Sequence, residues 1–172
     1  MEVVKDPDNT ARERLTRMVE AYQQPLLTMC FAYLHDMQLA EDAVQETFLR
    51  AYRALDAFRG ESSEKTWLTS IAINICRDVR RRAWFTRENR GLSIDDLPLA
   101  ADQQTRDAYD LADAVMQLPA RYREVILLYY YQELTMPEIG KAIGLSTSMV
   151  SRRIKKAQSR LQAVLGKEHP DA

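Results

Sequence analysis

Residues 134–161 carry the pattern of two short helices joined by a tight turn. Thr135 and Glu138 have the spacing of a capping box, in which each side chain satisfies a backbone N–H group at the start of the first helix. Gly144 supplies the conformational freedom that the turn needs. Five apolar residues fall where a helix-turn-helix buries its inner faces: Ile139, Ile143, Leu145, Val150 and Ile154. The stretch therefore predicts a helix-turn-helix.

The second helix of this pair is basic, and Ser146 or Thr147 is expected to cap it. Between residues 151 and 167 there are six Lys or Arg residues and no acid. The residues left for its outer face are Ser148, Met149, Ser151, Arg152, Lys155 and Lys156. A helix of this polarity is predicted to lie in a DNA major groove and to contact several phosphates. The alternative is an ordinary helical hairpin with a solvated basic face.

Composition favours an all-helical protein with two nucleic-acid contacts. The 172 residues include only five Gly, and the 46% hydrophobic content is ample for packed cores. Since the net charge is −1, binding to nucleic acid must come from local patches. Residues 76–90 hold six Arg against two acids, whereas acids outnumber basic residues in 36–64 and 88–113. Two basic islands and two acidic segments indicate two separate nucleic-acid contacts and a basic protein partner.

The first half of the chain predicts one helical bundle. Helical spacing of apolar residues covers 12–34, 38–55 and a stretch that follows a loop at 58–63 and runs to residue 82. Pro25 indicates either a kink or two abutting helices in the first of these. Asp36 is expected to cap the second helix, and Ser62 or Ser63 the third.

The second half of the chain predicts a separate helical domain. Residues 85–104 break the periodicity and are rich in acids, which is typical of a flexible linker. Helical spacing then resumes up to residue 117. A further helix begins at Pro119, runs to residue 131 and precedes the helix-turn-helix. Gly166 is expected to stop the last helix. The predicted fold is all-α, with two small helical domains, 12–84 and 105–166, joined by the acidic linker.

Several classes of function are disfavoured. Cys30 and Cys76 lie in apolar surroundings without the Cys/His spacing of a zinc site, which predicts two reduced, buried thiols. His35 and His169 have no nucleophile or ligand set beside them, and no phosphate- or dinucleotide-binding glycine motif occurs. There is no signal peptide and no apolar run of about 18 residues. We therefore expect a cytoplasmic protein without stable membrane insertion, a metal site, a cofactor or an enzymatic activity.

Three passages of the chain resemble the extracytoplasmic-function (ECF) sigma factors of the sigma-70 family, the initiation subunits of bacterial RNA polymerase. Residues 40–52 are similar to the family's polymerase-binding helix, 58–78 to its −10 element reader and 118–161 to its −35 element reader. The match spans residues 12–165 in the family's order. By this resemblance the two domains are sigma regions 2 and 4, with region 1.1 and the separate region 3 domain absent.

The resemblance implies roles for individual residues. The residues expected to contact core RNA polymerase at its β′ clamp are Glu41, Asp42, Gln45, Glu46 and Phe48, although spacing alone fits a solvated helix face equally well. The residues expected at −10 DNA are Ser62, Ser63, Lys65, Trp67, Asn74, Arg77, Arg80 and Arg81. Trp67 also fits a core residue, and Asn74 a plain surface amide. The residues expected at −35 DNA are Ser148, Ser151, Arg152, Arg153, Lys155 and Lys156.

The resemblance also implies partners and a mode of control. The partners are core RNA polymerase, through its β′ clamp and β flap, promoter DNA, and an anti-sigma factor that releases the chain upon a stress signal. No segment of the chain is expected to mask the DNA-reading surfaces by itself. The sequence departs from the family's usual pattern at 129–131, Tyr-Tyr-Tyr, and at 148–153, so no consensus −35 sequence is transferred. The alternative function is a helix-turn-helix regulator that acts without binding the polymerase core.

Overall fold

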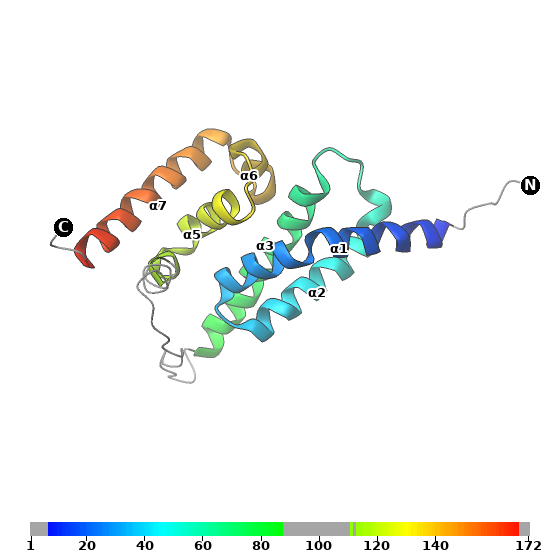
Figure 1. Cartoon of the computed structure of the whole chain (residues 1–172), viewed down its shortest axis with the longest axis horizontal. Helices are drawn as coiled ribbons and strands as arrows, with labels where there is room; N and C mark the ends of the chain where they lie inside the picture. Colours follow the sequence, from blue (N-terminus) through cyan, green and yellow to red (C-terminus); the bar gives the residue numbers. More distant parts are fainter. Residues whose placement is uncertain (1–6, 88–110, 112, 169–172) are drawn as a thin grey trace, which may run out of the picture.

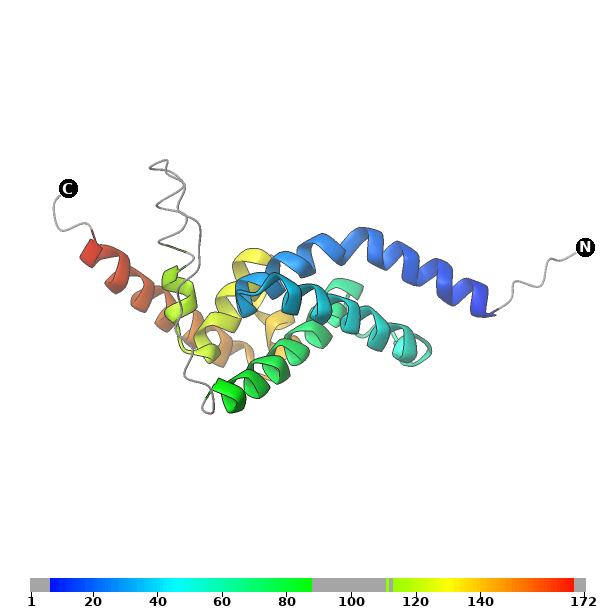
Figure 2. The same ribbon diagram turned by 90° about the horizontal axis from the view of Figure 1, so that it is seen from below.

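Every regular element in the described part of the chain is helical (Figures 1 and 2). The structure is a computed structural model, and it describes residues 7–87, 111 and 113–168. In chain order the elements are α1 (Pro7–Leu34), α2 (Met37–Ala54), the 3₁₀ turn η1 (Leu55–Ala57), α3 (Glu64–Arg87), α5 (Ala120–Ile126), the π-helical turn η2 (Leu127–Tyr131), α6 (Met136–Ile143) and α7 (Thr147–Glu168). Residues 113–117 are helical as well. This agrees with the predicted fold class.

Helices α1, α2 and α3 pack on one another as a bundle. The two-residue connection between α1 and α2 forces these helices to run antiparallel, and Asp36 caps α2 by accepting a hydrogen bond from the backbone N–H of Leu39 at 2.9 Å, as expected. The bundle buries apolar residues from all three helices, among them Met18, Leu26, Cys30, Val44, Ala51, Leu68, Ala72 and Cys76. Both thiols are free and buried.

Three helix ends and the course of α1 at Pro25 differ from, or decide between, the expectations. Helix α1 continues through Pro25, so the alternative of two abutting helices is wrong. Of the two candidate caps of α3, Ser63 is the one whose Oγ accepts from the backbone N–H of Thr66, at 3.0 Å. Helix α3 continues to Arg87, beyond the expected end at residue 82. Helix α7 continues through Gly166 to Glu168, because a single helical glycine costs only about 1 kcal/mol and does not end a helix by itself.

The helix-turn-helix forms as predicted. Both hydrogen bonds of the capping box are present, and those from Thr135 hold the pKa of the Glu138 carboxyl below its usual value. Gly144 adopts the left-handed conformation, with φ of 72°. Ser146 is the cap of α7, since its Oγ accepts from the backbone N–H of Met149 at 3.3 Å. Gly140, which the sequence pattern did not single out, lets α6 approach the turn closely: a Cβ there would lie 2.5 Å from the carbonyl oxygen of Leu145.

The two helical units lie against each other rather than apart (Figures 1 and 2). Helix α3 packs on α6, and α1 packs on η2. Gln132, from η2, donates its amide to the carbonyl oxygen of Pro25 at 2.8 Å, and Ser70 on α3 donates to the carbonyl oxygen of Ala142 at 3.1 Å. Lys141 on α6 donates to the carbonyl oxygen of Glu61 at 3.1 Å. Residues 88–104 of the expected linker lie outside the described residues, but the units that it joins form one body.

Replacing Gly140 by Ala is expected to destabilise the helix-turn-helix by about 1–3 kcal/mol, because the added methyl group meets backbone rather than a side chain that can move. The matched control is Gly166→Ala in α7, where a Cβ meets nothing within 4 Å. That replacement should be neutral or stabilise by about 0.5–1 kcal/mol. Urea unfolding followed by circular dichroism measures both; equal stability of the two variants would contradict the close approach at Gly140.

Candidate nucleic-acid interface

The outward face of α2 carries the acidic residues expected to contact a protein partner. Glu41, Asp42 and Gln45 are exposed, and Glu46 is half-buried. Glu46 pairs with Arg50 one turn later at 2.7 Å. Such exposed pairs contribute little to folding, about 0.3–0.5 kcal/mol, so this face can exchange its partners at low cost.

Phe48 does not belong to this face. The residue is only 8% exposed and packs in the core, which disfavours its expected contact with the polymerase. The next residue, Leu49, is 51% exposed and falls on the same side of the helix as Asp42 and Glu46, because helix neighbours recur three and four residues apart. The sequence reasoning missed it, although the helical period alone separates the two positions.

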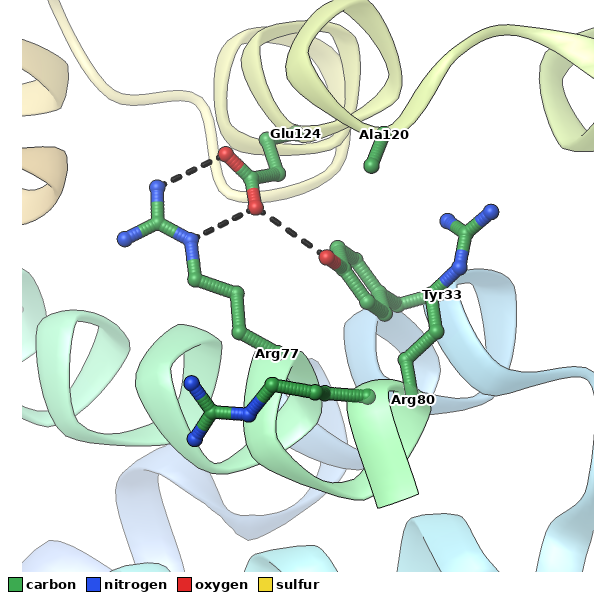
Figure 3. Close-up of a pocket in the computed structure, with 6 residues that line it drawn as sticks. Tyr33, Arg77, Arg80, Ala120 and Glu124 are labelled. Atoms are coloured by element: carbon green, nitrogen blue, oxygen red, sulfur yellow. Dashed lines mark hydrogen bonds and ion pairs between the residues drawn. The ribbon is translucent and has the colours of Figure 1, made fainter. Parts of the chain in front are cut away.

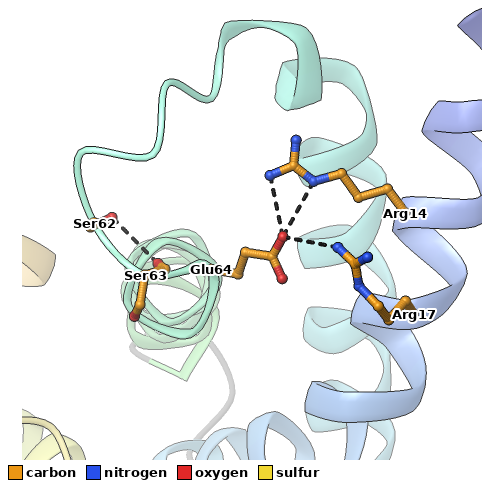
Figure 4. A network of polar contacts seen from close by, with 5 residues as sticks. All are labelled: Arg14, Arg17, Ser62, Ser63 and Glu64. Carbon is orange, nitrogen blue, oxygen red and sulfur yellow. Dashed lines mark hydrogen bonds and ion pairs between the residues drawn. The ribbon is translucent and has the colours of Figure 1, made fainter.

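The start of α3 is held to α1 by charged contacts (Figure 4). Glu64, at the start of α3, accepts from Arg14 at 3.2 and 3.3 Å and from Arg17 at 3.4 Å. Ser62 and Ser63 lie beside this junction, with the Ser62 hydroxyl directed at the carbonyl oxygen of Ser63 at 3.4 Å. These contacts fix the start of α3, where Ser62, Ser63 and Lys65 were expected to meet DNA.

Trp67 is half-buried and its ring is covered on one side. Phe58 stacks on it with the ring centres 4.4 Å apart, and Arg14 lies 5.3 Å above the Phe58 ring. This packing favours the structural alternative for Trp67 over its use as a platform for an unpaired base. The stacked pair packs the start of the loop at 58–63 against α3.

Glu124 on α5 reaches across to α3 and α1 (Figure 3). Its carboxylate accepts from Nε and Nη2 of Arg77 at 2.6 and 2.7 Å and from the hydroxyl of Tyr33 at 3.0 Å. Glu124 is 4% exposed and Tyr33 2% exposed. Burial, reinforced by the charge of Glu124, raises the pKa of Tyr33 well above its usual value, and the hydrogen bonds to Glu124 raise the pKa of Arg77. The network is therefore a charged, desolvated junction between the two units.

Asn74, Arg80 and Arg81 surround this junction. Asn74 is exposed on α3, and its side-chain oxygen accepts from Nη1 of Arg77 at 3.2 Å. The Arg80 guanidinium lies 6.0 Å from the Tyr33 ring centre, and its buried Nη1 has no hydrogen-bond partner among the described residues. Arg81 is exposed and pairs with Asp78 at 2.7 Å. Together with Tyr33, Glu124 and Ala120, the three arginines line an open pocket between the units.

Arg123, beside Glu124, positions α5. It is buried and donates to the carbonyl oxygens of Val115 at 3.3 Å, Leu118 at 2.9 Å and Met116, which caps the helix that precedes α5. Burial, with a smaller effect of the nearby Arg80, lowers the pKa of Arg123 to about 10, so it remains charged at neutral pH. Arg123 was also missed, since nothing in its local spacing marks it as a cap.

Helix α7 lies on the side of α5 and α6 away from α3 (Figure 1), and its basic residues are mostly exposed. Ser148, Arg152, Lys155 and Lys156 are exposed, while Ser151 and Arg153 are half-buried. Val150 and Ile154 hold the opposite side of the helix in the core. All six residues expected at −35 DNA are therefore within one helix, and four of them are exposed.

The residues expected at −10 DNA and those expected at −35 DNA are not equally accessible. Arg77 on α3 is occupied by Glu124, and α6 covers the start of α3 through Lys141 and Ser70. For the residues expected at −10 DNA, this differs from the expectation that no segment masks them: the second unit contacts Arg77 and the start of α3, while Ser63, Asn74 and Arg81 stay exposed. Local sequence patterns could not show this, because the contact joins residues 47 positions apart.

Two further findings concern the described residues only. They contain no group of His, Cys, Asp or Glu side chains suited to hold a metal ion. None of their helices combines the length and the apolar character needed to cross a membrane.

Comparison with known proteins identifies the family. Residues 18–86 match the family model described as Sigma-70 region 2, and residues 114–163 match Sigma-70, region 4. The chain is 30% identical over 165 residues to the ECF RNA polymerase sigma factor SigX of Bacillus subtilis (strain 168), covering 90% of this chain and 83% of the relative. The chain belongs to the ECF RNA polymerase sigma factors of the sigma-70 family.

Two other similarities differ in coverage. The chain is 32% identical over 188 residues to the ECF RNA polymerase sigma factor SigG of Mycobacterium tuberculosis (strain ATCC 25618 / H37Rv), covering 93% of this chain but 51% of SigG. It thus spans about half the length of that relative. The sigma factor RpoE from Bartonella quintana, solved in complex with the anti-sigma factor NepR, shares the fold with a TM-score of 0.74 at 24% identity, covering 89% of this chain and 97% of RpoE.

Proposed function

We propose that this chain binds core RNA polymerase and directs it to promoters by reading their −10 and −35 elements. One observation carries the proposal: a helical bundle that matches region 2 and a helix-turn-helix that matches region 4 occur in one chain, each with an accessible charged helix. The acidic face of α2 suits a basic protein surface, and the basic face of α7 suits duplex DNA.

Regions 2 and 4 have different binding roles. Residues 12–84 form region 2, residues 85–104 the linker, and residues 105–166 region 4. Helices α1 and α3 extend region 2 by a few residues at either end. Region 2 contacts the β′ clamp through Glu41, Asp42, Gln45 and Glu46, and the exposed Leu49 adds apolar contact at the same face. Ser62, Ser63, Lys65, Asn74, Arg77, Arg80 and Arg81 serve the −10 element, with Trp67 shaping their loop. Region 4 contacts the β flap and, through α7, the −35 duplex.

The chain acts by binding, without an enzymatic activity or a cofactor of its own, and in the cytoplasm, where polymerase and promoters are found. An anti-sigma factor restrains it until a stress signal. The relative solved with an anti-sigma factor supports this last point by the shared fold alone.

Run-off transcription with core polymerase and genomic DNA fragments tests the function. Promoter-specific transcripts that depend on the chain are expected. A helix-turn-helix regulator that does not bind the core is the second candidate, because the basic face of α7 alone would suffice for it. Binding to DNA fragments without any chain-dependent transcript would favour that candidate.

Reversing Asp42 and Glu46 to Lys is expected to weaken binding to core polymerase at least about thirtyfold, because a reversed charge at such an interface costs about 2 kcal/mol or more. Both residues are at most half-buried, so the variant should unfold like the wild type. The control is Glu20→Lys with Asp56→Lys, which makes the same change of charge at two exposed positions off this face. Fluorescence titration with labelled core measures the affinities; equal affinity of both variants would remove α2 from the interface.

Replacing Arg152 by Ala is expected to cost about 1–3 kcal/mol at particular −35 base pairs, because its guanidinium is exposed on the groove-facing side of α7. Replacing Asn74 by Ala should spare −35 binding and impair opening of the −10 element. Gln162→Ala, exposed later on α7, is the control. Permanganate footprinting on duplex and pre-melted promoters separates these effects, and normal opening by the Asn74 variant would exclude its role in holding an unpaired base.

A further inference from the structure

All three nitrogens of the Arg77 guanidinium donate hydrogen bonds in this structure. Its Nε and Nη2 donate to the two carboxylate oxygens of Glu124, and its Nη1 donates to Asn74. Carboxylates and phosphates bind Arg in the same two-pronged geometry. A phosphate therefore cannot take these donors while Glu124 holds them. The two residues assigned to the −10 strand on this turn of α3, Asn74 and Arg77, are tied into a contact with region 4.

Other contacts of region 4 cover the beginning of the same surface. Glu138 on α6 accepts a long hydrogen bond, 3.4 Å, from Thr66, and Lys141 donates to the carbonyl oxygen of Glu61. Ser70 donates to the carbonyl oxygen of Ala142. The loop before α3 and the first turns of α3 therefore face α6. Helix α7 lies apart from this contact, as Figure 1 shows, and Arg152, Lys155 and Lys156 on it are exposed.

The pocket at the junction carries more positive than negative charge. Arg77, Arg80 and Arg81 line it together with the single carboxylate of Glu124, among the residues that the structure describes, and a buried nitrogen of Arg80 lacks a partner there. Three clustered guanidinium groups are the pattern that tracks a nucleic-acid backbone. Glu124 satisfies part of this charge when DNA is absent.

We propose that Arg77 is a shared anion site, at which the Glu124 carboxylate of region 4 and a phosphate of the unpaired −10 strand exclude each other. The inference rests on the proposed role of α3 and adds its regulation: region 4 keeps the −10 surface closed until it moves away, while the −35 surface of α7 stays open. Since only the open fraction binds, the apparent affinity for single strands falls in proportion to that fraction.

The test measures binding of a fluorescein-labelled single strand of 12 nucleotides and mixed sequence to the full chain, by fluorescence anisotropy at fixed low salt. Glu124→Gln keeps the shape of the side chain but removes its charge, and it should tighten binding about tenfold or more. Glu20→Gln, which removes one negative charge from an exposed site on α1, should leave binding at the wild-type level. The double variant Glu124→Gln/Arg77→Gln should lose the gain.

A duplex control and a substitute variant complete the test. Binding to a duplex of the same length and mixed sequence should change less than about twofold in Glu124→Gln, because α7 is already exposed. If Glu124→Gln fails to unfold cooperatively, Tyr33→Phe takes its place; it removes one of the three hydrogen bonds to Glu124 and should give a smaller gain of the same sign. The proposal is overturned if Glu124→Gln, or Tyr33→Phe in its place, binds single strands no better than Glu20→Gln. It is also overturned if the double variant keeps the gain, or if the duplex gains equally.

The competition is read without polymerase, so its outcome is separate from that of run-off transcription. If Glu124 and the single strand compete for Arg77 but no chain-dependent transcripts form, the shared site is supported and the proposed function is contradicted. If chain-dependent transcripts form but Glu124 and the single strand do not compete, the proposed function is supported and the shared site is contradicted.

Discussion

The buried carboxylate of Glu124 joins the two halves of this molecule. It lies 2.6 and 2.7 Å from two nitrogens of Arg77 and 3.0 Å from the hydroxyl of Tyr33. A carboxylate that is almost entirely withdrawn from water needs such partners, because burying an unpaired charge is far more costly than the pair is favourable. Arg77 is 35% exposed in its side chain, so part of its charge remains hydrated and the pair can separate without stranding a cation. Such a contact can hold two units together and still release them.

The rest of the arrangement follows from where α5 points. Arg123 fixes α5 to the helix before it, which sets the neighbouring Glu124 toward α3, and the capped turn of the helix-turn-helix sets α6 over the start of α3. Helix α7 then falls on the opposite side, with its basic face in solvent. The same packing thus covers Arg77 and the start of α3 and leaves the basic face of α7 exposed, so the proposed −10 and −35 contacts differ in accessibility in the free protein.

Local features of this chain could be predicted from the sequence, and contacts between distant segments could not. Thr135, Glu138 and Gly144 act within a few residues of each other, so their spacing predicts the capping box and the turn. The burial of Phe48 and the exposure of Leu49 follow from the helical period, whereas the family resemblance alone does not separate these two positions. Glu124 meets Arg77 across 47 positions and Tyr33 across 91, and Gly140 is required by the backbone of the turn rather than by a motif. The contacts of Glu124 and the requirement for Gly140 have no local signature in the sequence.

The distance between the two units in the free protein tests this arrangement most directly. Nitroxide labels at Arg53→Cys on α2 and Ser159→Cys on α7 report it by double electron–electron resonance, since both positions are exposed and the native Cys30 and Cys76 are buried. One narrow distance population is expected for the otherwise wild-type chain at neutral pH. Adding Glu124→Gln should broaden it and shift it to longer distances. A broad distribution in the wild-type background, unchanged by Glu124→Gln, would contradict a body held together by Glu124 and Arg77.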